Sequence, residues 1–280
     1  MANYDVLGNI VLVKFLRETR FKEKKKFAQR FLNEHKNVRT VLEKTDKIKG
    51  RLRIPKSKFI AGENTKEVLY NENCCVFRFN VDSCYFSPRL SSERKEIAGL
   101  VKKNEKVLVM FGGVGPFAVA IAKRKKASLV CSIELGKEAN KYAIENVKRN
   151  KVDVELIQGD VRKKCKDLND NTQKSTIFGA TKPKTASLQR KLNGFVGFDR
   201  IVMARPNLKD SFLDCAFSIV KKNGIIHYYG FYLEEEKHKL EELVLLEAKK
   251  ARRKIKILKI KKAGDIGVRK FRYRVDFKIL

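Results

Sequence analysis

The sequence predicts an α/β protein in which a small α+β domain, residues 1–85, precedes a larger domain, residues 86–280. Before residue 85, short segments alternate apolar and polar residues, which is typical of half-buried strands. After residue 86, strand-like apolar runs alternate with helical patterns, which predicts βαβ units and a mainly parallel sheet. With 280 residues, 43% of them hydrophobic, the chain is long and apolar enough to build a core of this size.

The N-terminal domain is expected to combine one helix with several short strands. The run NIVLVKF is typical of a strand, and Phe27, Phe31 and Leu32 recur at helical spacing in the segment that follows it. Turns rich in glycine, asparagine and lysine then separate four alternating segments: VRTVLEK, GRLRIPKSKFIAGE, KEVLYNE and CCVFRFNV. None of these segments carries an evident catalytic cluster.

The larger domain is expected to begin with a helix that Ser87 caps and in which Pro88 takes the first helical position. From there strands and helices alternate, and the last two segments predict an antiparallel hairpin. The segments are KVLVMF, PFAVAIAKR, ASLVCSIEL, KEANKYAIENVKRN, VDVELIQGD, FDRIVMA, KDSFLDCAFSIVKK, GIIHYYGFY, EEKHKLEELVLLEAKKA, IKILKIKK and FRYRVDFKI. Residues 166–197 interrupt the alternation without periodicity, so a long mobile loop is expected there.

The charge balance favours a polyanionic partner. The chain has 64 Lys and Arg against 32 Asp and Glu, a net charge of +32. Basic side chains that neutralise phosphates release condensed counterions, so this surplus suits a nucleic acid. The alternative is a lysine-rich proteome in which these side chains are merely solvated. The basic stretches are FKEKKKFAQR, KSKF, KRKK, KKARRKIKILKIKK and RKFRYR.

Several other classes of protein are not indicated. No apolar run approaches the ~20 residues of a membrane span, and the N-terminus has neither the basic region nor the cleavage site of a signal peptide. The six cysteines show no CxxC pair and no histidine at zinc spacing. We therefore expect a reduced, metal-free, cytoplasmic protein without a membrane partner.

Three expected strand ends carry residues that suit an adenosine-bearing ligand. In a doubly wound sheet, ligands bind beyond the carboxyl ends of the strands. The loop FGGVG follows the first strand, and its glycines let the backbone approach a ligand closely. Glu134 ends the next strand, where it can accept hydrogen bonds from a ribose diol, and Asp160 ends the third, where it can accept from an adenine amino group. A GxGxxG motif is absent, and a tight turn beside two solvent-facing acids is the alternative.

Six segments occur in the order and spacing of a known family: YDVLGNIVLVKF, HKNVRTVLEK, YFSPRLSSER, MFGGVGPF, ENVKRN and GIIHYYGF. From about Tyr4 to its end, the chain resembles the archaeal and eukaryotic tRNA (guanine-37-N1)-methyltransferases. The resemblance implies a Rossmann-like class I methyltransferase sheet that binds S-adenosyl-L-methionine, preceded by a small RNA-binding domain. It also implies the tRNA anticodon loop as the partner, and we expect a monomer. Many members carry a further N-terminal module, which this chain is expected to lack.

The resemblance assigns roles to individual residues. It implies two catalytic residues. Arg89, at the end of FSPR, would stabilise the charge that develops on guanine O6, and Glu134 is the nearest acid that could take the N1 proton. The implied cofactor-binding residues are Arg89, Phe111, Gly113, Val114, Gly115, Glu134, Leu135, Asp160, Val161 and Ala204. The implied substrate-binding residues are Arg89, Arg205, Pro206 and Tyr228.

Two positions depart from the family pattern. Val109 replaces an aspartate before the Met-Phe pair, which lowers the expected cofactor affinity, and Ala204 replaces an asparagine that contacts the target guanine. Arg205 could compensate from the same turn, or the pocket could be shaped for a modified guanine. Three functions therefore stay open: methylation of N1 of guanosine 37, methylation of C7 of the wyosine precursor at that position, and tRNA binding with weakened catalysis. The aromatic residues of HYYGF could lie beside a flipped base or fill the sheet, and His227 is expected to be structural.

Overall fold

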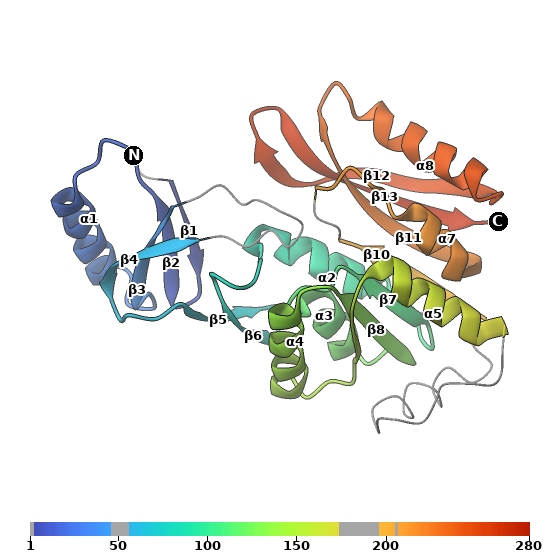
Figure 1. Ribbon diagram of the computed structural model, residues 1–280, viewed down its shortest axis with the longest axis horizontal. Coiled ribbons are helices and arrows are strands. Elements are labelled where there is room, and N and C mark those ends of the chain that lie inside the picture. Colours follow the sequence, from blue (N-terminus) through green and yellow to red (C-terminus); the bar gives the residue numbers. More distant parts are fainter. Residues whose placement is uncertain (1–2, 46–55, 174–195, 205–206) are drawn as a thin grey trace.

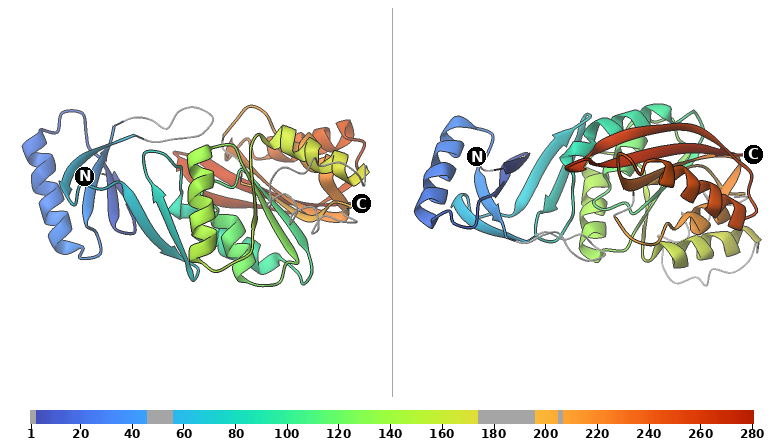
Figure 2. Two further views of the ribbon diagram at one scale, coloured as in Figure 1. Left: turned by 60° about the horizontal axis from the view of Figure 1, so that its bottom comes forward. Right: turned by 90° about the horizontal axis from the view of Figure 1, so that it is seen from above.

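Three sheets make up the fold (Figure 1). The computed structural model describes residues 3–45, 56–173, 196–204 and 207–280. Within these ranges a four-stranded sheet lies at one end of the molecule, a seven-stranded sheet forms the other end, and a two-stranded sheet lies between them (Figures 1 and 2). The predicted succession of a small α+β unit and a mainly parallel sheet is therefore present.

The N-terminal sheet is covered by one helix. Its strands pair in the order β1 (Asn3–Leu7), β2 (Ile10–Lys14), β3 (Thr40–Lys44) and β4 (Ser57–Gly62). Helix α1 (Phe21–Glu34) packs on this sheet through Ala28 and Phe31, which are buried with Val11, Val13 and Val41. The helical spacing of the apolar residues in α1 thus produces its buried face. Lys22, Lys25 and Lys26 are exposed, whereas Lys24 turns toward the sheet and pairs with Glu43 of β3 at 2.6 Å.

The hairpin of β5 (Glu67–Glu72) and β6 (Cys75–Asn80) is tied to helix α4 (Lys137–Arg149). The Asn146 side chain accepts a hydrogen bond from the Arg78 N–H at 2.7 Å and donates to the Arg78 carbonyl at 3.1 Å. Asn150 repeats this exchange with Val76 at 2.8 and 2.7 Å. Two asparagines of the ENVKRN segment, one helical turn apart, therefore pair with a strand edge as a neighbouring strand would. The hairpin thus contacts the larger domain, and the boundary at residue 85 stays a prediction.

The seven-stranded sheet has the strand order β12-β13-β11-β10-β7-β8-β9. The strands β11, β10, β7, β8 and β9 each pair in parallel with the next strand in this order. Strands β12 and β13 form the predicted antiparallel hairpin, and β13 pairs antiparallel with β11. The strands are β7 (Lys106–Met110), β8 (Leu129–Glu134), β9 (Glu155–Gln158), β10 (Phe198–Met203), β11 (Val220–Leu233), β12 (Ile255–Gly267) and β13 (Lys270–Ile279). The order reverses between β7 and β10, and at such a reversal the connecting loops diverge and leave a crevice at the carboxyl edge.

Helices pack on both faces of this sheet. Helices α2 (Ser91–Leu100) and α3 (Pro116–Lys123) share one core with α4 beside them, and α5 (Val161–Gln173), α7 (Leu213–Ile219) and α8 (His238–Lys250) share the other. Because side chains alternate along a strand, Leu108 and Met110 enter the second core whereas Val107 and Val109 enter the first. Val109 is fully buried there. No described helix is long and apolar enough to cross a membrane.

Two sequence-based predictions about local structure are correct only in part. Pro88 begins a short 3-10 helix, η1 (Pro88–Leu90), and α2 begins only at Ser91. Ser87 makes no side-chain cap, and its carbonyl instead accepts from Arg94 at 3.0 Å. The predicted loop begins at residue 166, but in the structure α5 continues to residue 173. Residues 174–195 lie outside the described ranges. The apolar residues of α5, namely Val161, Cys165 and Leu168, recur at helical spacing and are all buried. The many polar residues around them make this helical periodicity hard to recognise in the sequence.

The pairing of Asn146 with β6 can be tested by stability. Asn146→Ala leaves the backbone groups of Arg78 and the buried Val114 carbonyl, 3.0 Å from the Asn146 amide, without their partner. We expect a loss of roughly 2–4 kcal/mol in the free energy of unfolding, measured by urea denaturation. The exposed control Lys148→Ala on the same helix should stay within about 0.5 kcal/mol. Equal effects of the two substitutions would contradict this account.

Candidate functional site

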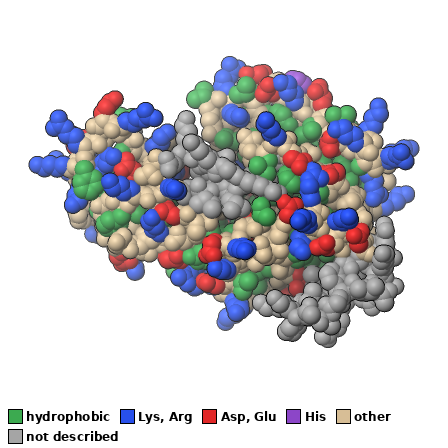
Figure 3. All heavy atoms as spheres, viewed as in Figure 1, with side chains coloured by type: hydrophobic (Ala, Val, Ile, Leu, Met, Phe, Trp, Pro, Cys, Tyr) green, Lys and Arg blue, Asp and Glu red, His purple; other side chains and the backbone are tan. Residues whose placement is uncertain are grey.

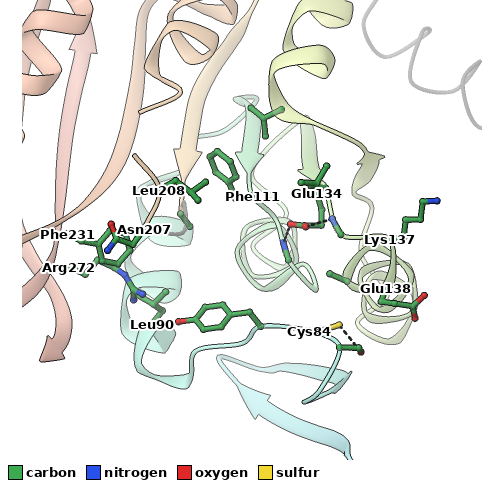
Figure 4. Close-up of a pocket in the computed structure, with 18 of the residues that line it drawn as sticks. Cys84, Leu90, Phe111, Glu134, Lys137, Glu138, Asn207, Leu208, Phe231 and Arg272 are labelled. Atoms are coloured by element: carbon green, nitrogen blue, oxygen red, sulfur yellow. Dashed lines mark hydrogen bonds between the residues drawn. The ribbon is translucent and has the colours of Figure 1, made fainter. Parts of the chain in front are cut away.

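A cavity of about 700 Å³ lies at the carboxyl edge of the large sheet (Figure 4). Its volume falls within the roughly 300–1,000 Å³ typical of small-molecule sites. The lining residues follow β6, β7, β8 and β10 or belong to η1, α4, α5, β11 and the β12–β13 hairpin. The residues that line it include Asp82, Tyr85, Leu90, Phe111, Gly113, Glu134, Leu135, Val161, Ala204, Asn207, Leu208, Phe231 and Arg272. The reversal of strand order thus produces the crevice expected there.

The glycine turn after β7 reaches the cavity through Phe111 and Gly113. Gly113 has a φ of +56°, and a Cβ added there would meet only the Tyr85 carbonyl, at 3.9 Å, so its backbone is open to a ligand. A Cβ added at Gly112 would lie 2.0 Å from the Ser132 Oγ, which packs the turn tightly against β8. Val114 and Gly115 lie behind the turn: Val114 is buried in the core, and Gly115, with a φ of +89°, precedes α3. The structure therefore brings two of the four predicted loop residues to the cavity.

Glu134 joins the turn after β7 to the turn after β8. Its Oε2 accepts a hydrogen bond from the Gly113 N–H at 2.7 Å, and its Oε1 accepts from the Gly136 N–H at 2.6 Å (Figure 4). Burial raises the pKa of the Glu134 carboxyl, and the backbone N–H groups of Gly136 and Gly113 offset this only in part, so the pKa lies above its ordinary value. Each carboxylate oxygen has a second lone pair, so Glu134 keeps acceptor capacity for a ligand hydroxyl.

Asp160 does not line the cavity in this structure. Its Oδ1 accepts from the Arg162 N–H at 2.8 Å, and its carbonyl accepts from the Lys164 N–H at 2.9 Å, so the residue caps the start of α5. The neighbouring Val161 and Leu135 do line the cavity and supply apolar surface on the same side as Glu134.

These residues fit the expected cofactor. A carboxylate that can accept from a ribose diol, an open glycine backbone and the apolar surface of Phe111, Leu135 and Val161 lie along one side of a single cavity. A carboxylate with acceptor capacity beside apolar walls suits the ribose and the base of an adenosine moiety.

The opposite side of the cavity carries a different set of side chains. Ala204 directly follows β10, and Asn207, Phe231 and Arg272 gather on the side away from Glu134 (Figure 4). The Arg272 guanidinium lies 5.2 Å from the centroid of the Phe231 ring. The predicted substrate residues Arg205 and Pro206 lie outside the described residues.

Arg89 lies outside the cavity, whereas the resemblance to the family implies that it contacts the cofactor and the target base. Its side chain is 56% exposed, does not line the cavity and forms an ion pair with Asp5 of β1 at 2.8 Å. Burial raises the pKa of the Asp5 carboxyl, but hydrogen bonds from Lys44 and Arg89 outweigh it, and the net pKa is lowered. The carboxylate therefore stays charged and holds the guanidinium against the N-terminal sheet. The neighbouring Leu90 does face the cavity.

Tyr228, the other predicted substrate residue, is 1% exposed and packs in the core between the sheet and α7 and α8. The physical reason is alternation along β11, because Phe231, three residues further on, lies on the opposite face and lines the cavity. His227 is also buried, with its Nδ1 2.6 Å from Asp276 and its Nε2 2.7 Å from the Arg200 guanidinium. Burial lowers the pKa of His227 despite the neighbouring Asp276, and these buried contacts agree with the structural role expected for it.

The family follows from comparison with known proteins. A model described as the TRM5/TYW2 methyltransferase domain matches residues 68–186 and 168–258, and one described as the TYW2 N-terminal domain matches residues 1–65. The chain belongs to the TRM5/TYW2 methyltransferase family. This confirms the resemblance inferred from the sequence, the Rossmann-like class I fold and S-adenosyl-L-methionine as the cofactor.

Individual members of the TRM5/TYW2 family are similar along nearly the whole chain. A Nanoarchaeum equitans protein named tRNA (guanine(37)-N(1))/4-demethylwyosine(37)-methyltransferase is 36% identical over 99% of this chain and 100% of its own length. A Pyrococcus abyssi tRNA (guanine(37)-N(1))-methyltransferase is 32% identical over 99% of this chain and 75% of its own. The crystal structure of Trm5b from Pyrococcus abyssi superposes with a TM-score of 0.80 at 32% identity, covering 99% of this chain and 74% of that one.

Sequence reasoning missed the polar residues on the second side of the cavity. Asn207 lies three residues beyond Ala204 in the same strand-end connection, so searching each connection for amide side chains would have found it. Arg272 reaches the cavity because β13 pairs antiparallel with β11, which places residue 272 opposite Phe231. No local signal in the sequence specifies that register.

The carboxylate of Glu134 should make cofactor affinity depend on pH. Protonation removes an acceptor for a ribose hydroxyl, so affinity should fall as the pH drops through the raised pKa, at a higher pH than for an ordinary glutamate. Glu134→Gln should weaken binding roughly 10- to 100-fold and flatten this acidic decline, both measured by calorimetry from pH 4.5 to 8. The exposed control Glu145→Gln should keep the wild-type curve. A decline that survives in Glu134→Gln would assign it to another group.

Proposed function

We propose that this protein transfers the methyl group of S-adenosyl-L-methionine to N1 of guanosine at position 37 of tRNA, which leaves S-adenosylhomocysteine and releases the N1 proton to solvent. The observation that carries the proposal is one cavity with two chemically distinct sides at the reversal of strand order. The side of Glu134 fits the adenosine of the cofactor, and the side of Ala204, Phe231 and Arg272 is left for an acceptor base. Relatives that are 36% and 32% identical are named for methylation of position 37, which supports this assignment.

The cofactor, when bound, supplies a methyl group on a positively charged sulfur. This chain contributes position and surroundings: Glu134 and Gly113 hold the adenosine side, and apolar residues such as Phe111 and Leu208 line the walls of the cavity. Holding two reactants in line accounts for a large part of the rate in such transfers. Because Glu134 bonds to two backbone N–H groups on the cofactor side, we assign it to the cofactor and not to the N1 proton.

The acceptor side offers an amide in place of the one that Ala204 lacks. Asn207 is exposed at the rim of the cavity, on the same side as Phe231 and Arg272 (Figure 4). Its side chain has both a donor and an acceptor for the edge of a base. We propose that Asn207 takes over the contact that the sequence assigned to the missing asparagine.

The exposed surface suits a tRNA. Lys and Arg side chains are spread over both the N-terminal sheet and the larger domain on the face shown in Figure 3. With a net charge of +32, the chain can contact phosphates at several points at once, and such binding weakens steeply with salt. We propose that a monomer binds the anticodon arm with both domains around the cavity and captures the base of position 37 from its unstacked loop.

Methylation of C7 of the tricyclic wyosine precursor at the same position is the second candidate. The relative that is 36% identical is named for both reactions, and the small side chain of Ala204 leaves more room for a wide base than an asparagine would.

Methyl transfer to defined tRNAs tests the proposal. With a tritiated cofactor, unmodified tRNA with G37 should be labelled and the same tRNA with A37 should not, and nucleoside mass spectrometry should identify 1-methylguanosine. Labelling of tRNA that carries the wyosine precursor would support the second candidate. Tight cofactor and tRNA binding without transfer to either acceptor would leave only the binding function.

Arg89 can reach the acceptor only after it leaves Asp5. A pair in which the arginine is 56% exposed contributes about 0–1 kcal/mol, so its release costs little once tRNA is bound. We expect Arg89→Met to lower the single-turnover rate at least about 100-fold without changing cofactor affinity. Asp5→Asn should keep or raise the rate. If Arg89→Met retains the wild-type rate, Arg89 has no part in the transfer.

A further inference from the structure

Arg272 and Phe231 form a pair at the carboxyl edge of the sheet. They are register partners on the antiparallel strands β13 and β11, so their side chains project to the same face. The guanidinium lies 5.2 Å from the ring centroid, within the range of a cation–π contact. Both residues are half-buried and line the cavity on the side away from Glu134 (Figure 4). The ring thus limits the orientations of the guanidinium fork.

The neighbouring Arg274 shows what a structural arginine is like on this strand. It is fully buried and forms ion pairs with Glu93 and Glu96 of α2 at 2.6 Å each, and with Asp276 at 2.8 Å. Arg272, two residues earlier on the same face, has no ion pair with any carboxylate in the described part of the chain. A half-buried guanidinium without a carboxylate keeps its donors for a ligand in the cavity.

We propose that Arg272 reads the O6 and N7 edge of the acceptor purine, an inference that rests on the proposed function. A guanidinium fork donates two parallel hydrogen bonds to O6 and N7 of guanine, which are adjacent acceptors. Adenine presents an N6 amino donor at that edge, which opposes the donors of Arg272. The contact with Phe231 holds the guanidinium at the wall of the cavity, where its donors can reach a base. Arg272 therefore selects guanine over adenine.

This contact explains how one cavity can accept two substrates. Reading the O6 and N7 edge leaves N1 open for methylation. In the tricyclic wyosine precursor the third ring closes over N1 and N2 of the former guanine, and the O6 and N7 edge is retained. A residue on that edge therefore recognises both bases equally, whereas a residue on the N1 and N2 edge would reject one of them.

A double-mutant cycle between protein and tRNA tests the contact. One partner is wild type or Arg272→Met, and the other is tRNA with guanine or 7-deazaguanine, which carries CH in place of N7, at position 37. Affinity in the presence of S-adenosylhomocysteine and the single-turnover methylation rate are both measured. Each single change should lower affinity, with Arg272→Met, which loses the bonds to both O6 and N7, lowering it roughly 5- to 150-fold, and the two changes together should be no worse than Arg272→Met alone. Effects that multiply would overturn the proposal.

Controls separate the contact from charge and from folding. Arg272→Lys keeps the charge but lacks the fork, so it should not restore discrimination between guanine and 7-deazaguanine. Lys222→Met removes an exposed charge from β11, outside the basic stretches, and should leave the cycle unchanged. Thermal unfolding checks that each variant folds. If wild type transfers no methyl to tRNA with G37, the proposed function fails, while the binding cycle still decides whether Arg272 contacts N7.

Discussion

The site depends on the reversal of strand order between β7 and β10. Strands β8 and β9 extend the sheet on one side of β7, and β10, β11 and β13 extend it on the other, so the connections at the carboxyl edge diverge there. Glu134 stands on the first side and Phe231 with Arg272 on the second, and both sides open into one cavity. A donor and an acceptor can therefore be held by different elements and still meet at the ends of the two central strands.

Helix α4 supports this arrangement from outside the sheet. Ala143 packs against Gly115 beneath the glycine turn, while Asn146 and Asn150 hold the edge of β6. The chain leaves β6 directly into residues 82–85, which form the wall of the cavity opposite the strand ends. One helix thus positions both the cofactor turn and the outer wall, which gives a physical reason for two asparagines in the ENVKRN segment.

The sequence predicts those parts of the molecule that depend on local pattern. Glu134 was predicted correctly as a cavity residue because it ends a continuous apolar strand, and position along such a strand fixes where the side chain lies. Val109 does not line the cavity, because alternation turns its side chain into the core of α2 and α3, and the lower cofactor affinity expected from it stays a prediction. Arg89 and Arg272 depend on contacts between distant segments, with Asp5 in one case and β11 in the other, which no local pattern contains.

The most direct test of the account is a crystal structure with S-adenosylhomocysteine and a tRNA that carries G37. The account predicts the ribose diol at the Glu134 carboxylate, and the base of position 37 beside Ala204 with its O6 and N7 edge at Arg272. An adenosine bound on the side of β10 and β11, or a position-37 base stacked outside the cavity, would contradict it.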